Sequence, residues 1–137
     1  MVRSHLVILR RPYLDEILAG RKRVESRFTR GRRAPFGCIS VGDRLFLKVS
    51  SGPVCATASV KKVLEFENLS PGKMKQLKAK YNSLILGGED YWADKRESRY
   101  GVLVWLEGVE RIEPVRIAKK DWRAWVVLDG KEDFGLL

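Results

Sequence analysis

The sequence predicts an α+β fold, a small mixed β-barrel of about five to six strands with flanking helices that cover its ends. Short apolar or alternating segments, which are typical of strands, outnumber the segments with helical spacing. Short turns join neighbouring segments, and no strand-helix-strand unit recurs along the chain. With 137 residues and an apolar fraction of 45%, the chain has the size of one hydrophobic core. We therefore expect a single domain over residues 1–137.

The first part of the chain predicts a strand, a helix and a second strand. Residues 5–10 form a short apolar run that ends at charge and a proline, which is typical of a buried strand. In residues 12–18 apolar side chains repeat at helical spacing, and Gly20 supplies a left-handed stop. Residues 21–27 begin directly after this stop and lead into the second strand. Residues 29–35 have the composition of an exposed basic loop.

The middle of the chain predicts a β-hairpin followed by two helices. A turn at residues 41–43 leads into alternating residues 45–49, and the long strand 54–65 pairs back on them. Residues 70–81 carry apolar side chains at spacings of three and four among lysines, which indicates an amphipathic surface helix. A glycine pair then breaks the chain before a shorter helix over residues 89–99.

The last part of the chain predicts only strands. Residues 102–106 are apolar on both faces and indicate a central strand. Residues 109–117 continue as an edge strand, because their proline cannot donate a ladder hydrogen bond. Residues 122–128 are expected to close the sheet, within a C-terminal strand and tail over residues 119–137.

Positive charge is concentrated near the N-terminus. The chain has 27 Lys and Arg against 17 Asp and Glu, a net charge of +10, and residues 1–33 hold ten of the basic and three of the acidic side chains. Such a field attracts polyanions, so nucleic acid is the leading partner and an anionic membrane surface the second. A solvated basic surface without a partner is the alternative.

Composition also bears on the compartment. No apolar run approaches the roughly 20 residues of a membrane helix, and no secretory signal precedes the first charges, so we expect a soluble, cytoplasmic protein without membrane association. Cys38 and Cys55 are the only cysteines, and a chain of this size needs no disulfide, so reduced thiols are expected.

Several classes of chemistry are excluded. His5 is the only histidine and the cysteines lack a paired spacing, so we expect no metal site and no cofactor. No nucleophile elbow or cysteine-protease signature accompanies that histidine. The glycine pair at residues 87–88 is not followed by Lys-Ser/Thr at P-loop spacing.

The remaining candidate is the charged segment over residues 20–27. If this segment is extended from Arg23 on, then Arg23, Glu25 and Arg27 lie on one face while Val24 anchors the other face in the core. Arginines can bind phosphate bidentately, and the acid between them can accept hydrogen bonds from a base or sugar. A cross-strand row of surface ion pairs is the alternative interpretation.

This segment resembles a known family. The spacing Gly20-x-Lys22-x-x-Glu25-x-Arg27, preceded by LRRPY at residues 9–13, resembles the G-x-K-x-x-E-x-R pattern of the ASCH domain, which lies between its first helix and second strand. All four positions match. The resemblance continues through the turn at residues 41–45 and the late strand at 101–106, and it covers most of residues 6–118.

The resemblance implies a PUA-like β-barrel with a cleft between barrel and helices where RNA or a nucleotide binds, lined by Lys22, Glu25 and Arg27. Some members of the family are RNA-binding modules of coactivator type. Others are small amidohydrolases that deacetylate acetylcytidine with a lysine, a threonine and a glutamate, and a few are ribonucleases. The amidohydrolase pattern has a threonine where this chain has Glu25, so that mechanism is not matched here.

We therefore expect an RNA-binding module that recognises RNA or a nucleotide in a basic cleft, with DNA as a possible partner. The alternative is a hydrolase of a modified nucleoside, or a ribonuclease, in the same cleft. In that case Lys22, with a pKa lowered by its arginine neighbours, would act with Glu25 and Glu89. Trp92 lies in a polar segment and is expected to stack on a base. The expected nucleic-acid-binding residues are Arg21, Lys22, Arg23, Glu25, Arg27, Arg30, Arg32, Arg33 and Trp92.

Overall fold

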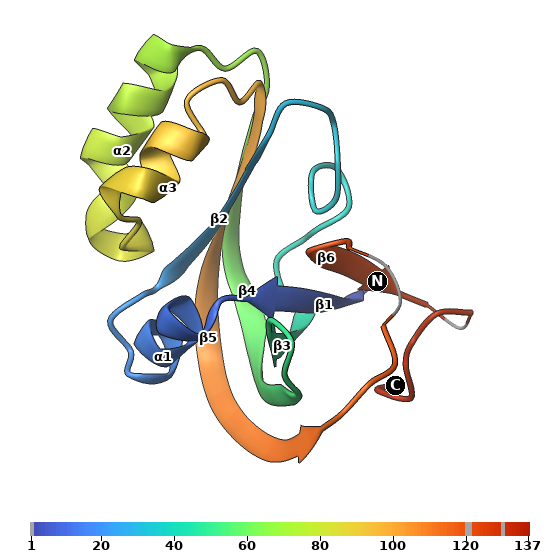
Figure 1. The fold of residues 1–137 in the computed structure, drawn as a ribbon. Coiled ribbons are helices and arrows are strands. Elements are labelled where there is room, and N and C mark those ends of the chain that lie inside the picture. Colours follow the sequence, from blue (N-terminus) through green and yellow to red (C-terminus); the bar gives the residue numbers. More distant parts are fainter. Residues whose placement is uncertain (1, 120–121, 130) are drawn as a thin grey trace.

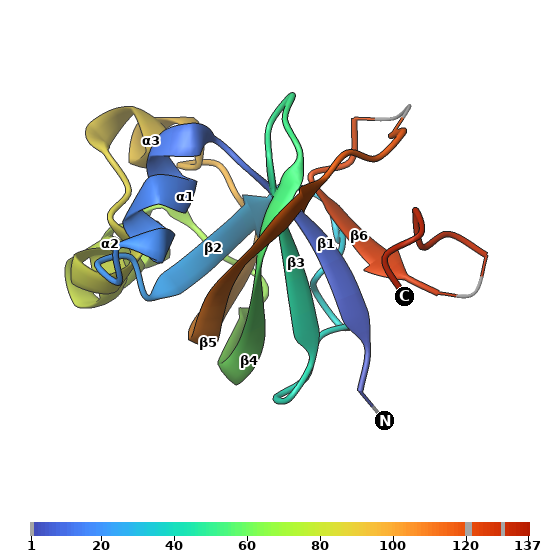
Figure 2. The same cartoon turned by 90° about the horizontal axis from the view of Figure 1, so that it is seen from below.

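The fold was analysed in a computed structural model that describes residues 2–119, 122–129 and 131–137. A six-stranded sheet of order β2-β5-β4-β3-β1-β6 curls into a half-barrel, and the helices gather beside its β2 edge (Figures 1 and 2). This arrangement confirms the predicted α+β barrel with flanking helices. The elements are β1 (Ser4–Leu9), α1 (Arg11–Leu18), β2 (Val24–Thr29), β3 (Arg44–Val49), β4 (Val54–Phe66), α2 (Pro71–Ile85), α3 (Glu89–Asp94), β5 (Tyr100–Val115) and β6 (Trp125–Leu128).

Strand pairing differs from the prediction at the C-terminal strand. The hairpin of β3 and β4 is antiparallel as expected, but β1 pairs with β3 in parallel. The C-terminal strand β6 pairs with β1 and forms one edge, while β2 forms the other. The expectation that residues 122–128 close the sheet is therefore wrong within the described residues. Closure would require a ladder between β2 and β6, and these strands are joined by side chains instead.

The half-barrel curvature comes from β4 and β5. Their pairing shifts register at three places, and such irregularities bend and twist a strand pair. Residues predicted as two strands form the single strand β5, which turns at Gly108 with a φ of 58°. Residues 101–105 pair with β2 as well as β4, whereas the later residues pair with β4 alone. Pro114 thus lies in the edge portion, as predicted.

The helices begin as predicted, and two of them end elsewhere. α1 buries Leu14 and Ile17 and stops before Gly20, whose φ of 79° is the expected left-handed conformation. α2 runs beyond residue 81 because Ile85, 1% exposed, extends its apolar stripe. α3 ends at Asp94, since residues 95–98 offer no apolar side chain to bury.

Two apolar clusters hold the layers together. One lies between α1 and the strands of the half-barrel, and the other packs α2 and α3 against β2 and β5 through Val24, Phe28, Met74 and Leu103. Val24, fully buried, is the core anchor that alternation predicts. Cys38 and Cys55 are free thiols. No helix in the described part of the chain is long and apolar enough to span a membrane.

Candidate functional site

A cleft of about 1550 Å³ lies where the two edges of the curled sheet face each other. Its floor comes from the end of β1 and from β2. The residues at the start of α3 form one wall, and the segment at 122–125, which leads into β6, forms another. Ala34 of the loop between β2 and β3 also lines the cleft. The site therefore occupies the place where a closed barrel would have continuous strand pairing.

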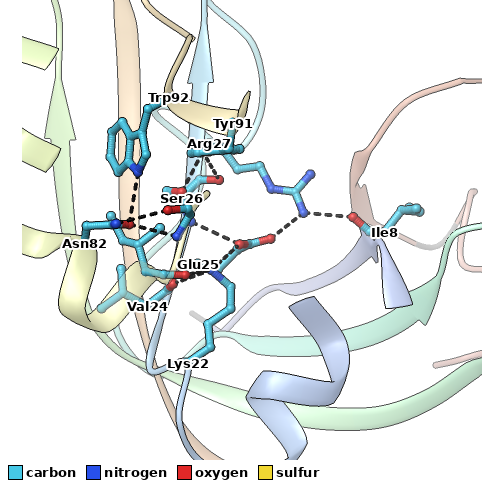
Figure 3. Close-up of polar contacts among 11 residues, drawn as sticks. Ile8, Lys22, Val24, Glu25, Ser26, Arg27, Asn82, Tyr91 and Trp92 are labelled. Atoms are coloured by element: carbon cyan, nitrogen blue, oxygen red, sulfur yellow. Dashed lines mark hydrogen bonds and ion pairs between the residues drawn. The ribbon is translucent and has the colours of Figure 1, made fainter. Parts of the chain in front are cut away.

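The floor of the cleft carries a buried ion triplet with Glu25 at its centre. The Lys22 Nζ lies 3.4 Å from the Glu25 Oε1, and the Arg27 Nη2 lies 2.7 Å from the Oε2 (Figure 3). The backbone N–H of Ser26 donates to the Oε1 as well, at 3.1 Å. Lys22 is 3% exposed and Glu25 is 6% exposed. The acid thus pairs with Lys22 and Arg27.

Lys22 connects β2 to the end of α2. Its Nζ donates to the carbonyl oxygens of Val24 at 2.9 Å and Ile85 at 2.6 Å, and it lies 5.3 Å from the centre of the Tyr13 ring. Burial lowers the pKa of Lys22, and the charge of Glu25 opposes that shift. Two carbonyl oxygens and the Glu25 carboxylate thus surround the Lys22 Nζ. In this arrangement Lys22 orients Glu25 and directs its donors at the protein.

Arg27 reaches across the cleft from one sheet edge to the other. The Nη2 donates to the carbonyl oxygen of Ile8 at 2.9 Å (Figure 3). The Nη1 donates to that of Ala124 at 3.2 Å. The guanidinium also lies over the Trp125 ring, 5.3 Å from its centre. A single planar side chain therefore joins β2, β1 and the segment before β6.

Glu25 stays ionised inside this network. Burial alone would raise its pKa, but the charges of Arg27 and Lys22, together with their hydrogen bonds, outweigh burial and lower it. The Oε2 accepts one hydrogen bond, from Arg27. A carboxylate oxygen has two lone-pair positions, so the Oε2 can accept a further hydrogen bond from a ligand in the cleft.

Two tyrosines form an aromatic wall beside this carboxylate. The Tyr91 Oη lies 2.6 Å from the Ser26 Oγ, and the Tyr91 ring meets that of Tyr13 edge to face, with centres 6.2 Å apart. Burial raises the pKa of Tyr91 strongly, so its hydroxyl is a neutral hydrogen-bonding group. The wall thus combines apolar faces with a polar tip.

The turn before α3 fits closely around these aromatic rings. A Cβ atom on Gly87 would lie 2.8 Å from both the Trp92 Nε1 and the Tyr91 Cδ2, so any larger residue forces a shift there. The side chain of Asn82 donates to the carbonyl of Gly87 and accepts from its N–H and from the Trp92 indole. Asn82 thereby fixes the position of the turn relative to α2.

The charges around the cleft are mixed, whereas the sequence predicted a basic cleft. Its described lining includes carboxylates on the side formed by α3 and cations on several elements. The carboxylates outside the floor are Glu89, Asp90 and Asp94, and the cations outside it are Arg10, Arg33, Lys95 and Arg123. A ligand with both phosphates and hydrogen-bond donors matches such a lining better than a bare polyanion.

The structure brings some of the predicted site residues together and separates the others. Those that line the cleft are Lys22, Glu25, Arg27, Arg33 and Glu89. Arg21 pairs with Glu16 at the surface. Arg23 precedes the first residue of β2 and lines a separate hollow, so the expected common face does not extend to it.

The remaining predicted residues lie outside the described lining. Arg30 and Arg32 are exposed in the loop after β2, and the Arg32 guanidinium lies over the Phe36 ring. Trp92 is 7% exposed and packs against Phe28, so its ring is not accessible to a base. Its neighbour Tyr91 faces the cleft instead.

Sequence reasoning missed several side chains of the cleft as site residues, among them Ser26, Lys95 and Trp122. For Trp122 a signal exists, because its neighbours in the chain are charged and offer no alternating apolar pattern. Ser26 and Lys95 carry no such signal, since their positions depend on how α3 packs on β2. No group of three or more metal-ligating side chains occurs in the part of the chain that the structure describes.

Comparisons with known proteins agree with this architecture. The model of the ASCH domain matches residues 7–126. The solved structure of ASCH from Zymomonas mobilis is similar with a TM-score of 0.73 at 16% identity, covering 94% of this chain and 90% of that one. A mutant of that protein gives 0.72 at 16% identity, covering 94% and 92%. The hypothetical protein PH0355 gives 0.50 at 20% identity, covering 78% and 97%. No curated protein sequence matches this chain.

Proposed function

This chain belongs to the ASCH domain family, and on that premise we propose that it binds RNA or a nucleotide in the cleft between its sheet edges. The observation that carries the proposal is the ionised carboxylate of Glu25, held at the cleft floor below a rim of mixed charge that includes Arg10, Arg33 and Lys95. An oriented carboxylate recognises amino, imino or hydroxyl groups, and rim cations recognise phosphates. A nucleotide presents both kinds of group.

The residues of the motif take different roles in this proposal. Lys22 and Arg27 act as positioning residues, because carbonyl oxygens and Glu25 engage their donors. Glu25 contacts the ligand, and Arg10, Arg33 and Lys95 contact phosphates. The exposed arginines outside the lining add to the long-range attraction of a polyanion rather than to its recognition.

RNA is preferred over DNA in this proposal because the 2′-hydroxyl is a donor that Glu25 can accept from. Free cysteines fit a reducing compartment such as the cytoplasm. The rival function is a nucleoside hydrolase or ribonuclease, supported by two carboxylates, Glu25 and Glu89, that line one cleft. In that case a carboxylate would be the general base, since two carbonyl oxygens and Glu25 already engage the Lys22 Nζ.

The test is the binding of a fluorescein-labelled 12-nucleotide RNA, followed by anisotropy at 0.1 M salt. Arg33→Gln, in the cleft, is expected to weaken binding about three- to tenfold. Arg21→Gln is the matched control, because that arginine is exposed and pairs with Glu16 outside the cleft. Equal affinities of these two variants, or no affinity in the wild type, would contradict the proposal.

The same samples decide between binding and hydrolysis. RNA recovered after incubation is analysed by denaturing electrophoresis, and acetylcytidine is incubated in parallel and analysed by chromatography. Intact RNA and unchanged nucleoside support a binding module. Products that disappear in Glu25→Gln and in Glu89→Gln, with the fold retained, would assign the hydrolase function instead.

A further inference from the structure

Trp122 is fully exposed at the wall of the cleft. Its side chain has 100% of its surface accessible and belongs to the cleft lining. Trp92 and Trp125 are 7% and 4% exposed, and Trp105 is partly buried. A tryptophan gains more than other residues from burial, so a bare indole beside a ligand cleft indicates a surface that a ligand covers.

The backbone next to Trp122 is fixed to the cleft floor. The carbonyl oxygen of Ala124 accepts from the N–H of Ile8 at 3.0 Å and from the Arg27 Nη1 at 3.2 Å. Arg123 pairs with Glu132 on the far side of β6. Trp122 is therefore only two residues away from a point that is tied both to β1 and to the ion triplet. The backbone on this side of the indole is thus anchored, which limits the ordering cost when a ligand covers the ring.

We propose that the cleft takes single-stranded RNA and that Trp122 stacks on an unpaired base at its mouth. This inference rests on the proposed function, and it names the ligand class and a recognition residue. Base stacking requires an accessible base face, which a strand has and a duplex lacks except at its ends. Arg10 and Arg33 belong to the same lining and can contact phosphates of the bound strand.

The experiment compares single-stranded and fully paired 12-nucleotide RNA of one sequence in wild type, Trp122→Ala, Trp122→Leu and Trp122→Phe. The wild type is expected to prefer the single strand, and Trp122→Ala to lose about 5- to 100-fold in affinity for it. Trp122→Leu, which keeps apolar area without a π face, loses nearly as much. Trp122→Phe retains most of the affinity. Val41→Ala is the control, because Val41 is exposed and outside the cleft lining.

A fluorescence readout separates stacking from a general effect on the fold. The difference in emission between wild type and Trp122→Phe reports the exposed indole, and RNA at saturation should quench it and protect it from iodide. Substitution of so exposed a side chain leaves stability nearly unchanged, so thermal unfolding should agree among the variants.

The outcomes distinguish this inference from the function on which it rests. RNA binding that depends on Arg33 but is unchanged in Trp122→Ala and Trp122→Leu overturns the stacking role and leaves the proposed function intact. Equal affinity for single strand and duplex also overturns it. No RNA binding by the wild type overturns both. Loss in Trp122→Ala and Trp122→Leu, retention in Trp122→Phe and a quenched indole support it.

Discussion

Glu25 keeps its negative charge although burial alone would raise its pKa, because Arg27 and Lys22 lower that pKa. The carboxylate is stabilised by one cation on each side and by the N–H of Ser26. Such a network is finely balanced, because removing one partner leaves the others buried without compensation. The same balance that holds the carboxylate ready for a ligand therefore makes it important for stability.

Glu25→Gln is expected to lower the free energy of unfolding by about 3 to 5 kcal/mol, because Lys22 and Arg27 would lose their buried counter-charge. Urea unfolding at pH 7 measures the change. Glu16→Gln is the matched control: its carboxylate pairs with Arg21 at the surface, where a pair contributes about 0 to 1 kcal/mol. A loss of similar size in both variants would show that the triplet does not stabilise the fold.

His5 forms a second buried network, with Trp125 and Asp43. The Trp125 Nε1 can only donate, and it donates to the His5 Nδ1 at 3.0 Å. The proton of the neutral ring therefore lies on the Nε2, which donates to Asp43 at 2.8 Å. Protonating the Nδ1 would place two donors against each other.

Burial lowers the pKa of His5, although Asp43 opposes the shift. In the unfolded chain His5 therefore binds a proton near pH 6.5, whereas in the folded chain it binds that proton only at lower pH. Stability should fall as the pH drops from about 7.5 through 6.5, by at most about 1.4 kcal/mol per pH unit. Asp43, whose pKa is also lowered, contributes only below about pH 4.

Urea unfolding at pH 7.5, 6.5 and 5.5 measures this dependence. Because His5 is the only histidine, His5→Gln should abolish it in this window. A wild type whose stability is constant over the three pH values would contradict the neutral ring.

At the scale of elements, the connection between α2 and α3 shapes the cleft wall. Asn82 makes its three hydrogen bonds to Gly87 and Trp92, at 2.8 to 3.0 Å. These contacts fix the turn between α2 and α3, where Gly87 and Tyr91 line the cleft. A side chain on one helix thus determines where the tyrosine of the next helix lies.

Asn82→Ala is expected to destabilise the protein by about 2 to 4 kcal/mol, since it leaves the Trp92 indole and the Gly87 amide without partners. Thermal unfolding measures the change, and ligand binding should weaken with it because Tyr91 moves. Ser83→Ala, at an exposed position of the same helix, is the control. Unchanged stability in Asn82→Ala would show that water replaces these hydrogen bonds.

The local elements could be predicted because their signals are local. Pro12 and Gly20 bound α1, and the alternation after residue 44 gives the β3 and β4 hairpin. The parallel pairing of β1 with β3 could not, because it joins strands separated by a helix and another strand. Among the tryptophans, composition favoured Trp92 as the accessible one, yet tertiary packing buries Trp92 and leaves Trp122 exposed.

For the site, the motif predicted which residues gather but not how they are used. Lys22, Glu25 and Arg27 do line one cleft. The hydrogen bonds of Lys22 and Arg27 to carbonyls of β1, α2 and the segment before β6 depend on the whole fold. Because of these bonds we propose that both cations position Glu25, whereas the sequence predicted that they bind phosphate. That the whole chain forms one domain stays a prediction.

At the scale of the whole molecule, the cleft between the two edges of the half-barrel holds the fold together and also leaves room for a ligand. A closed barrel would fill this place with strand pairing, whereas here Arg27 joins the edges and leaves room above it. The net charge of +10 attracts any polyanion, so attraction alone does not show that the cleft is used. What distinguishes the cleft is the small number of its cations that can touch phosphates.

That number predicts the salt dependence of binding. For single strands, log K falls with log salt by about 0.7 for each phosphate that the protein neutralises. If Arg10, Arg33 and Lys95 each contact one phosphate, the slope of log K against log salt should be about −2. Arg33→Gln should make it shallower by about 0.7, and Arg21→Gln should leave it unchanged. A titration from 0.05 to about 0.3 M salt measures the slopes.

A much steeper slope, equal in both variants, would mean that RNA binds the basic surface at large. A slope near zero would mean that an uncharged nucleoside is the natural ligand, because only the floor around Glu25 would then provide the affinity.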